Sequence, residues 1–243
     1  MIISKDTKMA EVIHHNYQLI PIISRFKIKF GFGDLTVEQV CKKHNVNAVL
    51  FIEIINVFNN EDYSPTAKLS KVPLKDTVNY LLRSHNFFNN IKLPLIEELI
   101  HDLCWKDVEQ NKNKDILNRF FDQYRREVTE HTSHEENEVY PFVLQIEKCF
   151  IDGKANDDCL IKLKSKSVKD YQDTHDELNS ALLDLKNIII KYLPPADNSE
   201  ITGRILTEIF RLEKDMADHT RIEDTVLLPM AYSMETEIRK LIS

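Results

Sequence analysis

Two histidine–glutamate pairs are the residues of this sequence best suited to chemistry. His131 is followed four residues later by Glu135, and His219 by Glu223. On a helix this spacing places both side chains on one face, where an imidazole nitrogen and a carboxylate oxygen can bind the same metal ion. A single histidine precedes each pair. The candidate metal ligands are therefore His85, His131, Glu135, His175, His219 and Glu223.

The pairs belong to an internal repeat with a period of 88 residues. The matched residues are His131, Thr132, Glu135 and Pro141 in the first copy and His219, Thr220, Glu223 and Pro229 in the second. The single histidines keep a similar distance, because 46 residues separate His85 from His131 and 44 separate His175 from His219. Each half would supply two imidazoles and one carboxylate, and the two carboxylates can bridge a pair of metal ions.

The alternative is that these side chains are polar core residues with hydrogen-bonded partners. For any one histidine taken alone that alternative is the commoner case. The six together favour metal, because burying two glutamates and four histidines without a cation costs several kcal/mol for each unpaired charge. Mixed imidazole and carboxylate ligands suit iron first, with manganese and zinc as alternatives.

The remaining histidines do not fit the same site. His101 follows His85 by 16 residues, which on one helix puts it about 160° around the axis and about 24 Å along it. His134 lies on the far side of His131 from Glu135, which predicts a solvated side chain or one that supports a ligand. The other three, His14, His15 and His44, are expected at the surface of an amino-terminal domain.

Four apolar patterns must position these ligands, and they run from about residue 73 to residue 235. Each pattern alternates steps of three and four residues, which is typical of a helix with one buried face. Each carries one of the candidate histidines on its apolar face. Polar stretches near 105–114, 151–158 and 193–199 separate the patterns. Short connections of this kind predict an all-α, antiparallel, up-down four-helix bundle.

A small helical domain is predicted over residues 1–60, in front of the bundle. Its apolar runs are short, and Thr36 with Gln39 forms a capping box at the start of one helix. Residues 61–72 are polar and contain Pro65, which is typical of a linker. The bundle then covers residues 73–235, and residues 236–243 form a tail.

Composition and charge narrow the class of protein further. Only four glycines and eight prolines occur in 243 residues, which favours helices over a β fold with many turns. The formal net charge of −7, with scattered Lys and Arg, gives no basic surface for nucleic acid. The charged amino terminus and the lack of a run of roughly 18 apolar residues predict a cytoplasmic protein without a membrane partner. The cysteines form no CxxC and are expected to be reduced and mostly buried, namely Cys41, Cys104, Cys149 and Cys159.

At the histidine–glutamate pairs the chain resembles the hemerythrin-like cation-binding family. The family signature is a histidine, three residues, a glutamate, another acid, two residues, two apolar or aromatic residues and a proline. Residues 131–141 and 219–229 both fit it. His85 lies ahead of Leu93 and Pro94, and His175 lies in Thr-His-Asp-Glu-Leu, as the single histidines of the family do. The resemblance covers residues 73–235.

Within that family the ligand set is closest to the repair-of-iron-centres proteins. The oxygen-carrying hemerythrins have a fifth histidine four residues after the one on the third helix, and this chain has Asn179 there. The last motif of this chain has Glu223 four residues after His219, whereas the oxygen carriers place an aspartate five residues after that histidine. The resemblance therefore implies two non-haem iron ions that share the carboxylates and an oxo or hydroxo bridge, with one iron less saturated. It also implies iron-sulfur proteins as partners and a task in restoring clusters damaged by nitrosative or oxidative stress.

The amino-terminal segment is similar to the short helical domain of the repair proteins, but its double-cysteine motif is missing. Gly31 and Phe32 stand where the thiols are expected, and Cys41 alone is expected to pack in the core. A module that binds or senses dioxygen or nitric oxide and signals to a partner is the alternative function. The sequence leaves open whether the chain is an enzyme and whether it forms a homodimer.

Overall fold

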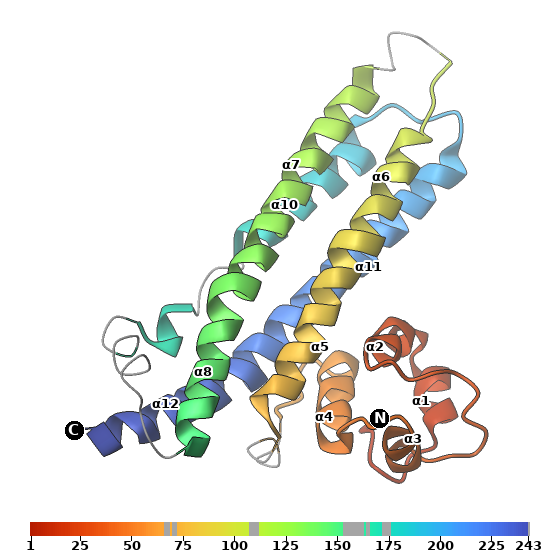
Figure 1. Cartoon of the computed structure of the whole chain (residues 1–243). Coiled ribbons are helices and arrows are strands. Elements are labelled where there is room, and N and C mark those ends of the chain that lie inside the picture. The colour runs from red at the N-terminus through yellow and green to blue at the C-terminus, as the bar shows by residue number, and fades with distance from the viewer. Residues whose placement is uncertain are drawn as a thin grey trace. The chain divides into compact units, whose positions relative to one another are not determined.

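The computed structural model describes residues 1–65, 69, 72–106, 112–152, 163, 166–171 and 176–242, and the regular elements in these ranges are helices joined by turns and loops. Within these ranges the backbone forms α-, 3-10 and π-helices and no β-strand, with one isolated bridge between Lys8 and Thr36. The all-α class predicted from the sequence is therefore confirmed (Figure 1). In the same ranges, no helix combines the length and the apolar character needed to cross a membrane.

Short helices fill the amino-terminal segment. They are α1 (Met9–His15), the 3-10 turn η1 (Tyr17–Leu19), α2 (Ile20–Arg25), α3 (Val37–Lys43) and α4 (Ala48–Asn59). The predicted capping box is present at the start of α3. Thr36 Oγ1 accepts from the Gln39 N–H at 3.3 Å, and Gln39 Oε1 accepts from the Thr36 N–H at 2.9 Å.

Longer helices follow, and π-helices interrupt them. The first group is α5 (Leu74–Phe87), η3 (Phe88–Lys92), α6 (Leu93–His101), α7 (Lys112–His134), η5 (Glu135–Val139) and α8 (Tyr140–Asp152). The second group is η6 (Val168–Tyr171), α10 (Asp176–Asn187), η7 (Ile188–Tyr192), α11 (Ser199–Ile222), η8 (Glu223–Leu227) and α12 (Leu228–Ile242). η6 is a 3-10 turn, whereas η3, η5, η7 and η8 are π-helices. Most of the predicted tail, 236–243, lies within α12.

The chain divides into two compact units. The first contains Met1–Arg83, Tyr140–Gln172 and Asp218–Ser243, and the second contains Ser84–Val139 and Asp173–Ala217. Helices α5 and α11 each contribute residues to both units. The domain boundaries predicted at residues 60 and 72 stay a prediction.

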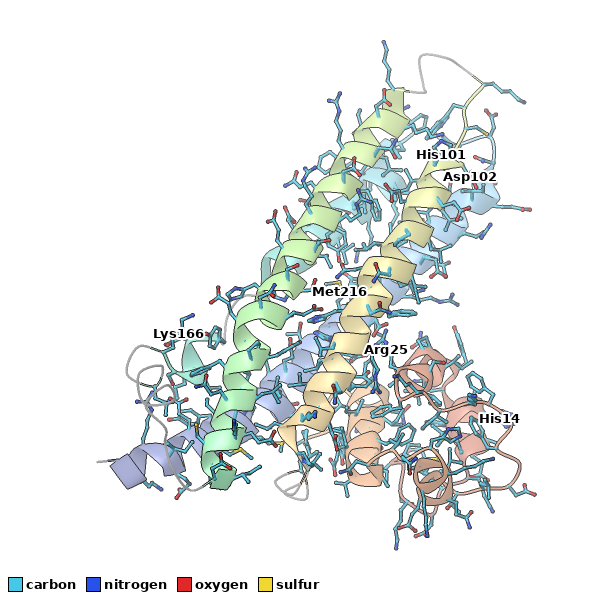
Figure 2. All side chains as sticks on the ribbon, in the orientation of Figure 1. His14, Arg25, His101, Asp102, Lys166 and Met216 are labelled. Atoms are coloured by element: carbon cyan, nitrogen blue, oxygen red, sulfur yellow. The ribbon has the colours of Figure 1, made fainter. Side chains whose placement is uncertain are left out.

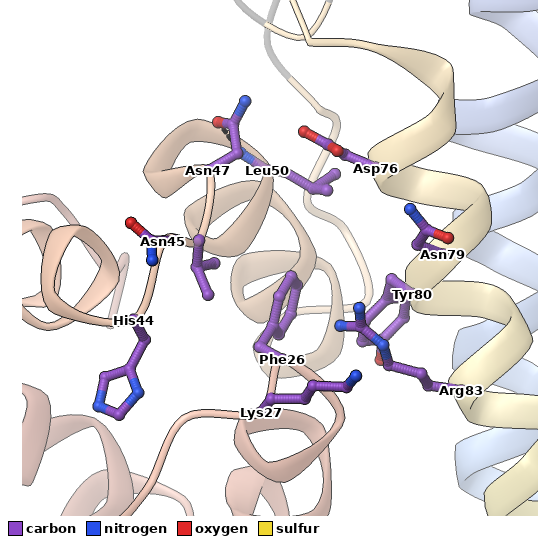
Figure 3. Close-up of a pocket in the computed structure, with 11 residues that line it drawn as sticks. Phe26, Lys27, His44, Asn45, Asn47, Leu50, Asp76, Asn79, Tyr80 and Arg83 are labelled. Atoms are coloured by element: carbon purple, nitrogen blue, oxygen red, sulfur yellow. Dashed lines mark hydrogen bonds between the residues drawn. The ribbon is translucent and has the colours of Figure 1, made fainter.

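In the first unit the amino-terminal helices pack on the first three turns of α5. Phe26 stacks on Tyr80 of α5 with ring centroids 4.8 Å apart, and the edge of Phe51 contacts Phe26 at 5.1 Å. Arg83 Nη1 donates to the carbonyl of Arg25 at the end of α2, 2.9 Å away, where a cation also favours the negative end of the helix dipole. Phe26, Tyr80 and Arg83 border a cavity of about 160 Å³ (Figure 3). The amino-terminal segment is thus attached to α5 two residues before His85.

Two buried glutamates, 88 residues apart, cap the starts of the helical segments that precede the single histidines in the sequence. Glu147 Oε1 accepts the N–H of Leu74 at the start of α5 at 2.6 Å, and Glu235 Oε2 accepts the N–H of Val168 at the start of η6 at 2.9 Å. Each carboxylate satisfies a backbone donor that the helix itself leaves open. The repeat seen around the histidine–glutamate pairs therefore extends to these helix starts, both in the first unit.

A single apolar core joins four helices in the second unit. Leu99 of α6, Phe121 of α7, Leu185 of α10 and Ile209 of α11 all belong to it and are at most 3% exposed. On α7, α10 with η7, and α11 the core residues follow steps of three and four, as the sequence pattern predicted. On α7 the core positions up to Val128 lie on the helix face that carries His131 three residues later.

Candidate metal centre

Wide helical turns carry both candidate glutamates. Glu135 begins η5, Glu223 begins η8, and a third π-helix, η3, starts three residues after His85. In such a turn an N–H bonds to the carbonyl five residues back, as the N–H of Leu228 does to the carbonyl of Glu223. π turns inserted in α-helices are frequent at functional sites.

A proline explains where these three turns widen. Pro94, Pro141 and Pro229 are each the second residue of the α-helix that follows the π turn. Proline has no N–H to donate, and its ring clashes with the carbonyl four residues earlier. Those carbonyls belong to the middle residues of the three π turns, Asn90, Asn137 and Thr225. The wide turn relieves the conflict, so the proline of the repeated motif sets the conformation in which each glutamate is presented.

The second unit brings His85, His131 and Glu135 together. Nε2 of His85 lies 3.1 Å from Oε2 of Glu135, and Nε2 of His131 lies 3.1 Å from Oε1 of the same carboxylate. His85 is fully buried and Glu135 nearly so. One buried carboxylate is therefore flanked by two imidazole nitrogens, one from α5 and one from α7, which are donor atoms suited to a first-row transition metal.

The other ring nitrogen of His85 has its own carboxylate. Nδ1 lies 2.9 Å from Oε1 of Glu136, whose side chain is 42% exposed. A proton held between Nδ1 and Glu136 leaves Nε2 with its lone pair toward Glu135, the tautomer that a metal ligand needs. Nearby, Asn89 Nδ2 donates to Thr132 Oγ1 at 2.9 Å and ties η3 to α7 next to His131.

The first unit brings His219, Glu223 and Tyr140 together. Nε2 of His219 lies 3.6 Å from Oε2 of Glu223, and the Tyr140 hydroxyl donates to Oε1 of Glu223 at 2.6 Å. All three side chains are buried. A carboxylate with a histidine at one oxygen and a phenol at the other is held in a fixed orientation.

Four of these buried side chains form a cluster that could hold a metal ion, namely His85, Glu135, His219 and Glu223. Two imidazoles and two carboxylates are a donor set that suits iron, manganese or zinc. Two carboxylates buried this deeply are costly unless a cation or hydrogen bonds compensate their charge. The chemistry of the donor set therefore fits a metal.

Five of the six predicted ligands fall in the described part of the chain. Four form the cluster, and His131 contacts Glu135 within the second unit. His175 lies outside the described residues, and the side chain of Asn179 is likewise not described. The assignment of all six as ligands stays a prediction.

The other histidines occupy positions consistent with their exclusion from the site. His101, at the carboxyl end of α6, has a side chain that is 83% exposed, and His14 on α1 is also exposed (Figure 2). His134 is exposed, and its Nδ1 lies 3.8 Å from Glu138. His44 borders the cavity of the first unit.

The three described cysteines are free thiols. Cys41 is fully buried, and burial raises the pKa of its thiol to about 12, so it packs in the core as predicted. Cys149 is also a buried free thiol, whereas Cys104 is exposed, and Cys159 lies outside the described residues. At the turn where the repair proteins carry paired cysteines, Gly31 has φ of 96°, a conformation that glycine adopts without strain.

Sequence reasoning missed three features of the site. It did not identify Glu136 as the partner of His85, or Tyr140 as the partner of Glu223, or the π turns. The second acid and the aromatic residue of the repeated motif were the available signals for the two side chains. The prolines at the centre of continuous apolar patterns were the signal for the π turns, because an interior proline has to be accommodated by a kink, a break or a bulge.

Comparison with known proteins gives one informative similarity. No protein-family model matches the chain. Over 230 residues the chain is 18% identical to a protein named iron-sulfur cluster repair protein ScdA from Staphylococcus haemolyticus (strain JCSC1435), and the alignment covers 93% of this chain and 97% of that protein. The similarity is distant but extends along nearly the full length of both chains, and it supports a relationship to the iron-sulfur cluster repair proteins.

Proposed function

We propose that this chain is a non-haem di-iron protein that takes part in the repair of damaged iron-sulfur clusters. The observation that carries the proposal is the arrangement around Glu135, a buried carboxylate with an imidazole nitrogen 3.1 Å from each of its oxygens. The cluster of buried histidines and glutamates supports a metal, and the distant similarity to a protein named for cluster repair supports iron and the physiological task.

The proposed centre lies in an antiparallel four-helix bundle of the hemerythrin type. Each half of the 88-residue repeat supplies two imidazoles and one carboxylate, with His175 completing the second half. Glu135 and Glu223 would hold the iron ions together with the four histidines. With six protein ligands for two metals, coordination positions remain open to an exchangeable ligand. Iron held in this way can be delivered to iron-sulfur proteins, which are the proposed partners.

Binding or sensing of dioxygen or nitric oxide is the second candidate function. The hydrogen bond between Arg83 of α5 and the carbonyl of Arg25 favours this second function, because Arg83 lies two residues before His85. A change in the orientation of His85 could reach the amino-terminal segment through this helix. Manganese and zinc remain the alternative metals.

Metal analysis tests the first part of the proposal. Full-length protein from cells grown with ample iron is expected to contain about two iron ions per chain. His85→Ala and His175→Ala should each lose about one of them and keep the helical circular dichroism signal. His101→Ala, an exposed histidine that follows His85 on α6, is the matched control and should keep both. A wild-type protein that binds no metal, or that binds zinc in place of iron, contradicts the proposal.

Transfer experiments separate the two functions. Iron-loaded protein mixed with an apo iron-sulfur protein and sulfide should lose iron as the cluster absorbance of the acceptor grows. A stable, reversible visible-absorbance change with dioxygen or nitric oxide, without iron loss, would favour sensing instead.

A further inference from the structure

Tyr140 contacts the candidate centre, although it is not one of the candidate ligands. It is the first residue of α8, directly after η5, and its hydroxyl donates to Oε1 of Glu223 at 2.6 Å. Tyr140 is 2% exposed and Glu223 is 4% exposed, so no bulk water competes for this bond. An O–H donor this close to a carboxylate forms a charge-assisted hydrogen bond, roughly twice as strong as one between neutral groups.

The repeat makes this contact one-sided. Position 228, which follows Tyr140 by 88 residues, is a leucine, whose side chain has no hydrogen-bond donor. The first glutamate has a different environment, because imidazole nitrogens of His85 and His131 lie 3.1 Å from its two oxygens. The two halves therefore match in their predicted ligands, whereas Tyr140 contacts only the carboxylate of the second half among the contacts described above.

We propose that Tyr140 is a positioning residue that makes the two carboxylates of the centre unequal. Its phenol holds Glu223 in one orientation and withdraws negative charge from that carboxylate, so iron bound mainly through Glu223 favours the ferrous state more than iron bound mainly through Glu135. This inference rests on the proposed di-iron function and deepens it, since ferrous iron is the more readily exchanged and donated form.

The expected effect follows from electrostatics. Ferric iron gains more than ferrous iron from a fully charged carboxylate, because its own charge is higher. A hydrogen bond donated to the ligand reduces that gain, and groups that hydrogen-bond to ligands commonly change metal affinity by about 10- to 100-fold. A tenfold change in the preference for ferric over ferrous iron corresponds to about 59 mV in a one-electron couple.

The test is a potentiometric titration of the iron-loaded, full-length protein, followed by its visible absorbance. Wild type should show two one-electron steps at different potentials. In Tyr140→Phe, which removes only the phenol oxygen, the higher of the two should fall by about 59 mV, the tenfold change above, so that the steps move closer together. Tyr140→Leu introduces at position 140 the residue type found at position 228. It should shift the potential of the same step in the same direction, so the test stays valid if one of the two variants folds poorly.

Tyr124→Phe is the matched control. Tyr124 is equally buried, but its hydroxyl contacts Met216 Sδ at 2.9 Å within the core of the second unit. This variant should leave both potentials unchanged. Two bound irons with unchanged potentials in the Tyr140 variants would overturn the role of Tyr140 alone, as would an equal shift in Tyr124→Phe. A wild-type protein without iron would overturn the di-iron function as well.

Discussion

At the scale of single residues, Glu136 determines how His85 is presented. His85 is fully buried, while Glu136 reaches its Nδ1 from a half-exposed position 2.9 Å away. The carboxylate can therefore orient the ring without bringing a second buried charge into the core. The buried Nε2 is left for the candidate centre.

Replacing Glu136 should weaken metal binding without unfolding the protein. Glu136→Ala removes the acceptor on Nδ1, so the imidazole loses its fixed tautomer, and the affinity for one metal ion should fall about 10-fold or more. Glu136→Gln keeps an acceptor oxygen and should lose less. Competition with a chromophoric chelator measures the affinities. Glu138→Ala removes an exposed carboxylate from the same π turn and should behave as wild type. Equal losses in the Glu136 and Glu138 variants would argue against a specific role for Glu136.

The thiols should differ sharply in reactivity. Because burial raises the pKa of Cys41 to about 12, roughly one thiol in ten thousand is a thiolate at pH 8, and the thiolate is the reactive form. Cys104 is exposed. Iodoacetamide at pH 8 should alkylate Cys104 and leave Cys41 unmodified, as measured by peptide mass spectrometry. Unfolding in urea should make Cys41 reactive, and fast labelling in the native protein would contradict its buried position.

At the scale of elements, a proline after each of the three π turns determines the wide backbone conformation from which the glutamates project. Pro229 is exposed, so replacing it removes no core contact. Its effect on the structure comes from the missing N–H and from the ring that opposes the carbonyl of Thr225. An alanine at this position could close the ordinary α-helical hydrogen bond and narrow η8.

Pro229→Ala should therefore lower metal affinity while leaving the apoprotein as stable as wild type or slightly more stable. The narrower turn would rotate Glu223 away from His219. In wild type, Oε2 of Glu223 lies 3.6 Å from Nε2 of His219. Chelator competition and thermal unfolding measure the two effects. Pro194→Ala is the control. Pro194 follows the π turn η7, which carries none of the candidate ligands, and its carbonyl accepts a hydrogen bond from Trp105 Nε1. Unchanged metal affinity in Pro229→Ala would show that the π turn is not needed.

At the scale of the whole molecule, a bound metal would link folding to iron supply. The described candidate ligands come from three helical stretches far apart in the sequence, α5, α7 with η5, and α11 with η8, so a metal that they share binds the folded chain and not the unfolded one. Such a ligand, free at 100 times its dissociation constant, stabilises the folded state by about 2.7 kcal/mol.

Removing the metal should lower the thermal midpoint by roughly 5 to 10 °C, since each kcal/mol shifts the midpoint of a chain of this size by about 2–4 °C. Calorimetry of the iron-loaded and chelator-treated protein measures the shift. Re-adding ferrous iron should restore it, whereas magnesium, which prefers oxygen ligands, should not. Identical midpoints with and without bound iron would contradict the link.

The sequence by itself determined the features that depend on neighbours along the chain. Apolar steps of three and four residues specified the helices, and Thr36 with Gln39 specified where α3 begins. The spacing of His131 and Glu135 placed both on one helix face. These predictions succeeded because helix geometry relates residues only three to five positions apart.

The tertiary structure decided the contacts that join distant parts of the chain. Glu136 meets His85 across 51 residues, and Tyr140 meets Glu223 across 83. No local pattern encodes these pairs, because they depend on how helices pack and on the rotation that each π turn adds. The six-ligand centre and the four-helix bundle follow from the sequence only as predictions, since whether side chains so far apart share a metal depends on that packing.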